Sequence, residues 1–320
     1  MAAMSAIVLA GDRRGSKLVL HENKAFLEFL REPLLTHVIK ALLAAERVGT
    51  IVVVGPAARI KELLDSCVFQ HRGKIVIIEQ RENLLENLKA GYVATFGIKY
   101  TKRQFEGLRK SEHADTPALF MPCDVPLVTP WEIDNFIHRA DSEHYEYTIG
   151  MTGEKAMEYY YPTQDNPGIE MGYYHLREGR CRHNNLHLGK PLKVKRLSYV
   201  EAMYEARYQT KFLNIVKLYS TLAFAGRRVS ASLRVFVALQ AAQSLYAKGG
   251  GWWYEYFRKG NSIRSVMNTI GGIMGLNMQS VFTEYGGATL DVDNAADLQV
   301  AEKMYDAWMA HQREIHEKTA

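Results

Sequence analysis

The feature that most constrains the fold is an alternation, in the first half of the chain, between short apolar runs and segments with helical periodicity. Runs rich in aliphatic and β-branched residues occur at 6–10, 50–54, 74–78 and 118–121. Between them, apolar residues recur every three or four positions and predict helices at 33–46, 57–66, 83–98 and 130–139. Continuously apolar strands that alternate with helices are typical of a parallel sheet covered on both faces. We therefore expect an α/β protein.

The second half has a different character. Its patterns predict strands at 145–151, 169–177, 278–283 and 288–292, helices within 198–256, and a final helix at 295–311. We therefore predict a core at 1–165, an inserted, mainly helical subdomain at 166–277, and a return to the core at 278–320 that supplies the last strands and the C-terminal helix.

Composition excludes several classes of protein. A chain that is 47% hydrophobic and 23% charged is neither disordered nor collagen-like. The formal charge of +5 is too small to demand a nucleic-acid partner, and it suits anionic small molecules or an anionic membrane surface. Three widely spaced cysteines favour a reducing cytoplasm, and the N-terminus does not resemble a signal peptide. The longest uncharged segment, 265–283, is too polar for a transmembrane helix.

In parallel sheets, ligands bind beyond the carboxyl ends of the strands, so the loops there carry the candidate chemistry. The loop at 9–18 follows the first strand and contains two glycines and several basic residues, with Lys24 further on. Glycines allow a phosphate to approach the backbone closely, and basic side chains offset its charge. An ordinary solvated turn is the alternative interpretation, and the residues alone leave both open.

Acidic residues follow two other predicted strands. Asp124 comes directly after the buried run at 118–121 and could hold nucleotide phosphates through Mg²⁺, although a turn or helix-capping aspartate has the same pattern. Asp291 and Asp293 come at the end of the last predicted strand, and Asp297 falls in the first turn of the final helix. Capping by Asp293 or Asn294 would explain one of these acids but not all three.

Together these elements resemble the NTP transferase (nucleotidyltransferase) superfamily, which includes molybdenum-cofactor guanylyltransferases and sugar-phosphate nucleotidyltransferases. The residues that carry the resemblance are 7–11 with the basic loop, Lys24 and 32–38, then 86–88, 122–126 and 290–298. The segment 122–126 is similar to the superfamily's metal-binding Asp-x-Pro turn, and 290–298 is similar to its late acidic element. Each piece is short, but their order and structural contexts make the set specific.

The resemblance implies a GT-A-like, Rossmann-like fold: a three-layer α/β/α sandwich with a mostly parallel, mixed sheet. It implies that an acceptor attacks the α-phosphorus of an NTP and that pyrophosphate leaves. The core would then bind the nucleotide and the helical insert would bind the acceptor. The expected cofactor is Mg²⁺, and the expected partners are an NTP and a small phosphorylated or lipid-linked acceptor.

The resemblance also assigns roles to residues. Lys24 would stabilise charge at the α-phosphate, and Arg13 and Lys17 would neutralise the other phosphates. Asp124 and Asp293 would hold Mg²⁺, while Asp291 would orient its neighbours. The expected nucleotide-binding residues are Leu9, Ala10, Gly11, Asp12, Arg14, Gly15 and Asn87. Asn185 would contact the acceptor from 183–187, which we expect to be a loop after a strand.

Some residues depart from the superfamily pattern. Asp12 stands where a glycine is usual, and we expect it to turn outward or to pair with Arg13 or Arg14.

Two other functions remain possible for this sequence. One is a GT-A glycosyltransferase that binds a nucleotide-sugar through Asp291-Val292-Asp293, and the other is a non-catalytic nucleotide-binding or membrane-surface protein. The aromatic and basic segment 249–259 is typical of membrane interfaces, although core packing or a homodimer interface is the commoner explanation.

Overall fold

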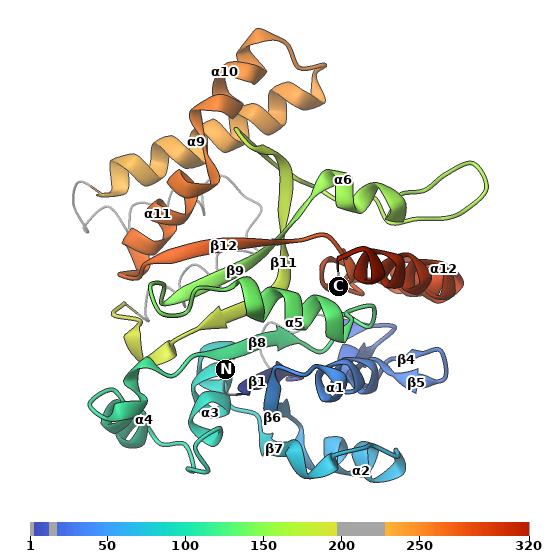
Figure 1. Cartoon of the computed structure of the whole chain (residues 1–320), viewed down its shortest axis with the longest axis vertical. Coiled ribbons are helices and arrows are strands. Elements are labelled where there is room, and N and C mark those ends of the chain that lie inside the picture. The colour runs from blue at the N-terminus through green and yellow to red at the C-terminus, as the bar shows by residue number, and fades with distance from the viewer. Residues whose placement is uncertain (1–2, 13–17, 197–227, 320) are drawn as a thin grey trace.

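The centre of the fold is an eight-stranded mixed sheet. A computed structural model describes residues 3–12, 18–196 and 228–319 of the chain (Figure 1). The strand order is β12-β9-β11-β8-β1-β6-β7, with β10 paired to β11. The strands are β1 (Met4–Leu9), β6 (Val48–Gly55), β7 (Ile75–Glu79), β8 (Ala118–Pro122), β9 (Tyr147–Gly153), β10 (Tyr174–Leu176), β11 (Gly179–Gly189) and β12 (Met278–Thr283). All neighbours are parallel except those of β11, which confirms the expected mostly parallel, mixed sheet.

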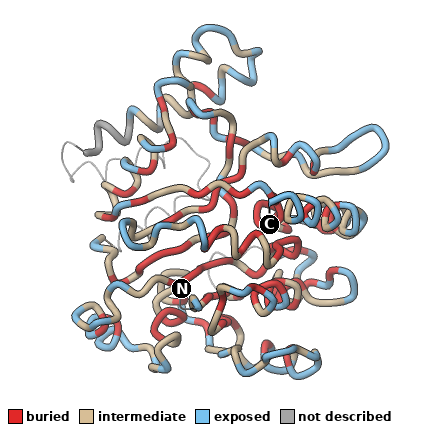
Figure 2. The backbone as a smooth tube through the Cα atoms, viewed as in Figure 1, coloured by how far each residue is buried: buried red, intermediate tan, exposed pale blue. Residues whose placement is uncertain are grey.

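Both faces of this sheet are buried, which explains why its strands are apolar without interruption. In β1, Ala6 and Val8 pack against the side of the sheet that carries α1 and α5, whereas Ile7 packs on the other side with Tyr92 and Phe105. Figure 2 shows the buried strands between more exposed outer helices. The expected α/β/α layering is thereby confirmed.

The helices of the first half lie where their periodicity predicts them. Two of them, α2 and α5, begin and end at the predicted residues, and α5 is capped by Thr129 with a proline in its first turn. The helices are α1 (Leu34–Ala44), α2 (Ala57–Ser66), α3 (Leu84–Ala94), α4 (Lys102–Leu108), α5 (Pro130–Arg139), α6 (Glu154–Met157), α9 (Arg228–Ala247), α10 (Trp252–Gly260), α11 (Ile263–Met274) and α12 (Ala295–Thr319). Residues 197–227, where more helix is predicted, lie outside the described part of the chain.

Three predictions for the second half need correction. The segment 183–187 is not a loop but the middle of β11, where an irregular register between His183 and His187 breaks the usual alternation. Of the strand predicted at 169–177, only β10 forms. The strand predicted at 288–292 is wrong: a short 3-10 turn, η6 (Gly287–Thr289), stands there, because Gly286 adopts a φ of 83° and Thr289 N–H bonds back to its carbonyl.

The division into a core and an insert stays a prediction. Within residues 166–277, β11 lies in the central sheet between β9 and β8, whereas α9, α10 and α11 lie at one end of the molecule (Figure 1). None of the helices in the described ranges is long and apolar enough to cross a bilayer.

Candidate active site

The sheet itself indicates where a ligand would bind. The chain leaves β1 for β6 on one side, continues to β7, and then returns to β8 on the other side of β1. Such a reversal opens a crevice at the carboxyl ends of the two central strands. Residues 10–12, which follow β1, and the turn after β8, which contains Asp124, lie side by side at this crevice, since Leu9 pairs with Pro122.

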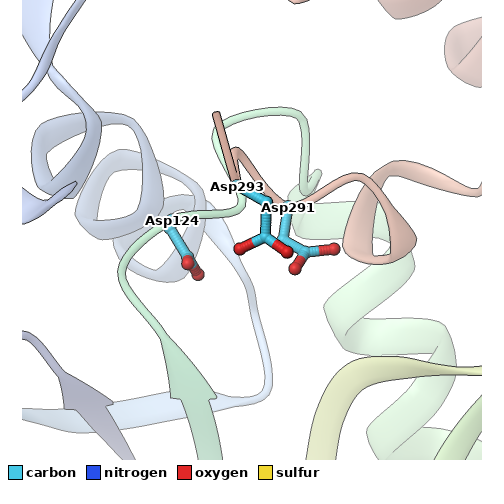
Figure 3. Close-up of side chains that lie close together, drawn as sticks. All are labelled: Asp124, Asp291 and Asp293. Atoms are coloured by element: carbon cyan, nitrogen blue, oxygen red, sulfur yellow. The ribbon is translucent and has the colours of Figure 1, made fainter. Parts of the chain in front are cut away.

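Three carboxylates gather there (Figure 3). Asp124, Asp291 and Asp293 each place one oxygen within 4.8 Å of the others. The two segments are joined directly, because the Val292 N–H donates to the Asp124 carbonyl at 2.9 Å. Asp293 does not cap α12: the Asn294 side chain accepts from the Asp297 N–H and does so instead.

Lys24 lies against this acidic cluster. Its Nζ donates to Asp124 Oδ2 and to Asp293 Oδ1, both at 2.7 Å. The neighbouring Asn23 sets this position, because its side chain donates to the Ala10 carbonyl at 3.3 Å and accepts from the Ala25 N–H at 3.0 Å. These bonds hold the backbone at Lys24 beside the end of β1.

The charges in the cluster affect one another. Burial disfavours the charged form of Lys24, but the carboxylates of Asp124 and Asp293 outweigh burial and raise the pKa of its ammonium. Burial, together with repulsion from the same two carboxylates, raises the pKa of Asp291 to about 6. Asp124 Oδ1 is buried and has no hydrogen-bond partner among the described residues. The cluster therefore has acceptor capacity that its own side chains do not use.

A buried polar network holds the turn that leads to Asp291. Glu132, fully buried in α5, accepts from the Ala288 N–H at 2.8 Å and from the Thr283 hydroxyl at 2.7 Å. Burial raises the pKa of Glu132 to about 7. Asn185 donates from its side chain to the Ala288 carbonyl at 2.9 Å, so at this point it supports the turn. No local pattern marks Glu132, because its position resembles that of any acid in the first turn of a helix.

The start of the loop after β1 contacts two other elements. A side chain at Gly11 would place its Cβ 3.1 Å from both Gln80 Oε1 and Asn87 Nδ2, so a larger residue would press on these two side chains. Asp12 exchanges two hydrogen bonds with Gln80, one from the Asp12 N–H and one to its carboxylate. Gln80, which follows β7 and is buried, is a further residue that the sequence analysis missed.

The structure thus brings six of the predicted site residues that it describes into two groups. Lys24, Asp124 and Asp293 meet with Asp291, and Gly11, Asp12 and Asn87 meet around Gln80. Leu9 ends β1, and Ala10 follows it fully buried. The remaining predicted residues, Arg13, Arg14, Gly15 and Lys17, lie outside the described residues.

Comparison with known proteins places this site in a family. The sequence profile of the MobA-like NTP transferase domain matches residues 6–217. A hypothetical transferase from Thermus thermophilus has a similar fold, with 21% identity and a TM-score of 0.61 over 93% of this chain and 100% of that chain.

Two other solved structures have a TM-score of 0.45. One is CMP:2-keto-3-deoxy-manno-octonic acid synthetase complexed with CTP, at 13% identity over 96% of this chain and 99% of that one. The other is 4-diphosphocytidyl-2C-methyl-D-erythritol synthase from Anaerococcus prevotii DSM 20548, at 12% identity over 95% and 96%. A comparison with curated proteins finds no match. Since the family profile spans more than half of the sequence, the chain is a nucleotidyltransferase that belongs to the family of MobA-like NTP transferase domains.

Proposed function

We propose that this nucleotidyltransferase uses Mg²⁺ to transfer a nucleoside monophosphate group from an NTP to a phosphorylated acceptor, with release of pyrophosphate. The observation that supports this proposal is the meeting of three carboxylates with Lys24 at the carboxyl ends of β1 and β8. An acidic cluster with one fixed cation suits a reaction in which several phosphate charges must be neutralised together.

The residues present fit a magnesium ion. Mg²⁺ prefers oxygen ligands, binds few carboxylates, and shares the oxygens of substrate phosphates. Asp124 and Asp293 would hold it, and the unpartnered Asp124 Oδ1 offers a ligand atom that Lys24 does not occupy. When bound, the ion would supply charge neutralisation and orientation of the phosphate oxygens.

Lys24 would act on the α-phosphate. Its ammonium is fixed by two carboxylates that also keep it protonated, so it can stabilise the negative charge that grows on the α-phosphate in the transition state. Backbone groups of Ala10 and Gly11, which precede the Asp12 N–H that donates to Gln80, would bind the nucleotide beside it. The Asp12 carboxylate accepts a hydrogen bond from the Gln80 side chain.

The reaction needs no general base from the protein when the acceptor is a phosphate monoester. Such a group has a second pKa of about 6 and is largely deprotonated at neutral pH. One of its oxygens forms a bond to the α-phosphorus while the bond to the bridging oxygen of the β-phosphate breaks. Pyrophosphate takes the electron pair of that bond, and the protein contributes positioning and charge.

The test is pyrophosphate release by the full chain with ATP, CTP, GTP, UTP and dTTP, each with Mg²⁺ or with EDTA. Acceptors are a panel of sugar and alcohol phosphates, and the matched controls are the same compounds without phosphate. We expect Mg²⁺-dependent release that requires the phosphorylated acceptor. Consumption of a nucleotide-sugar without pyrophosphate would support a glycosyltransferase instead, and NTP binding without turnover would support a non-catalytic protein.

A further inference from the structure

Two helices, α9 and α10, form a hairpin at one end of the molecule (Figure 1). α9 (Arg228–Ala247) and α10 (Trp252–Gly260) are joined by a short turn in which Gly249, Gly250 and Gly251 have φ angles of 98°, 76° and 98°. These left-handed values favour glycine and reverse the chain within a few residues. The turn therefore presents the start of α10 at its tip.

One face of α10 is anchored. The Tyr254 hydroxyl lies 3.1 Å from His175 Nδ1, and Arg258 donates to the Leu176 and Arg177 carbonyls at 3.0 and 3.1 Å. The Arg258 guanidinium also pairs with Glu255 at 2.8 Å. These bonds to β10 and the residue after it fix which side of α10 faces outward.

The opposite face carries three large aromatic side chains, which we call the aromatic ridge. Trp252, Trp253 and Tyr256 are 68%, 58% and 60% exposed. Their rings contact one another, with centroids 4.5 to 6.2 Å apart. The chain's other two tryptophans differ, since Trp308 is fully buried and Trp131 stacks on His316. A contiguous exposed group of this kind is typical of a docking surface.

The charges beside the ridge are mainly positive. Between residues 246 and 264 the basic residues are Lys248, Arg258, Lys259 and Arg264, whereas Glu255 is the single acid. Arg258 and Lys259 both pair with that acid, and Lys248 and Arg264 are exposed. The segment around the ridge therefore combines exposed aromatic rings with a net positive charge.

We propose that the aromatic ridge docks the protein onto an anionic lipid surface. Indole and phenol rings favour the headgroup region of a bilayer, and lysines beside them attract anionic lipids. Aromatic residues are enriched in protein–protein interfaces too, but lysine is depleted there, so the lysines favour a lipid surface over a second protein. Aromatic insertion and basic attraction would act together, as reversible attachment of a protein to a bilayer requires. The proposal does not depend on the reaction proposed above.

The test is sedimentation of the full chain with phosphatidylcholine vesicles, with and without phosphatidylglycerol, at low and high salt. We expect binding to the vesicles that contain phosphatidylglycerol, weaker binding at high salt, and a blue shift of tryptophan emission on binding. In the triple variant Trp252→Ser, Trp253→Ser, Tyr256→Ser, the affinity for these vesicles should fall by about tenfold or more. The matched control replaces two exposed apolar residues elsewhere, Val68→Ser and Tyr159→Ser, and should bind like the wild type.

A second pair of variants tests the charge. Lys248→Ala and Lys259→Ala should each weaken binding to the phosphatidylglycerol vesicles by about three- to fivefold and leave any binding to pure phosphatidylcholine unchanged. They also keep the proposal testable if the triple variant melts at a lower temperature than the wild type. Absence of wild-type binding, or full binding by the triple variant, would overturn it. So would a concentration-dependent dimer that the triple variant abolishes, because the ridge would then bind a second copy.

Discussion

The two sides of the acidic cluster are built by different means. Asp124 follows β8, a strand held between β1 and β11 and packed in the apolar core. Asp291 and Asp293 follow an irregular turn in which the Ala288 N–H donates to Glu132 and the Ala288 carbonyl accepts from Asn185. Thr283 in turn donates to Glu132. The first side is thus fixed by apolar burial and the ladder of the sheet. The second side is fixed by a buried polar network in addition to the buried side chains of Leu290 and Val292.

This difference has an energetic consequence. Apolar burial spreads its stabilising free energy over many small contacts. In a buried polar network, removing one partner leaves another polar group unsatisfied, which costs more stability. We therefore expect the Asp124 side to tolerate single changes in its supporting residues better than the Asp293 side. The four predictions below test this comparison.

The largest effect should come from the carboxylates themselves. Asp124→Asn should lower kcat/KM by about a thousandfold, which corresponds to about 4 kcal/mol of transition-state stabilisation. Asp293→Asn should lower kcat/KM less. The Asp293 side chain is 50% exposed and that of Asp124 only 13%, so water can replace part of what the Asp293 carboxylate supplies. Pyrophosphate release against Mg²⁺ concentration measures both, with the exposed Asp165→Asn as control. Equal activity in Asp124→Asn and the wild type would contradict the metal assignment.

Lys24 contacts both sides of the cluster, and its substitution should cause the second largest loss of activity. Lys24→Ala should lower kcat by about a hundredfold and change the KM for the NTP much less, because the ammonium would act mainly on charge that develops in the transition state. Lys40→Ala is the matched control, since Lys40 pairs with Glu32 on the surface. A change confined to KM would show that Lys24 serves ground-state binding alone.

The same comparison explains what the sequence could predict. The first half follows apolar periodicity, so its parallel strands and the helices α1, α2 and α5 agree with the predicted bounds within two residues. The helix predicted at 83–98 ends at Ala94, and α4 has no counterpart among the predicted helices. Asp124 and Asp293 are expected at one rim because each follows a predicted strand, and the structure brings them together. Only Asp124 follows a strand, however, since the 3-10 turn η6 stands where a strand before Asp293 is predicted. The metal-binding role of both residues stays a prediction.

Elements fixed by polar partners or by unusual backbone angles were not predictable. Glu132 and Ala288 are 156 residues apart, and nothing local marks either as a partner of the other. The hairpin of β2 (Leu18–Val19) and β3 (Glu22–Asn23) turns through Leu20 and His21 at φ angles of 52° and 64°. Such a turn usually carries asparagine and glycine, so its sequence gives no signal.

The third prediction concerns pH and the polar side of the cluster. Since the pKa of Glu132 is about 7 in the folded protein and its ordinary value is 4.5, the folded state keeps a proton that the unfolded state loses between these values. The free energy of unfolding should therefore fall by about 2–3 kcal/mol from this residue as pH rises from 4.5 to 7. Urea unfolding of Glu132→Gln should lack this contribution, and Glu143→Gln on the surface should keep it. Parallel pH curves for Glu132→Gln and the wild type would contradict the assignment.

The smallest effect separates two roles for Asn185. Removing its hydrogen bond to the Ala288 carbonyl in Asn185→Ala should cost about 1 kcal/mol in the placement of the turn, or about fivefold in the Mg²⁺ concentration needed for half-maximal activity. The KM for the acceptor should then stay unchanged, with Asn166→Ala on the surface as control. If instead the acceptor KM rises and the Mg²⁺ requirement does not, Asn185 contacts the acceptor as the family resemblance implies. In that case the polar network tolerates the loss of a partner as well as the apolar side does, and the contrast between the two sides fails.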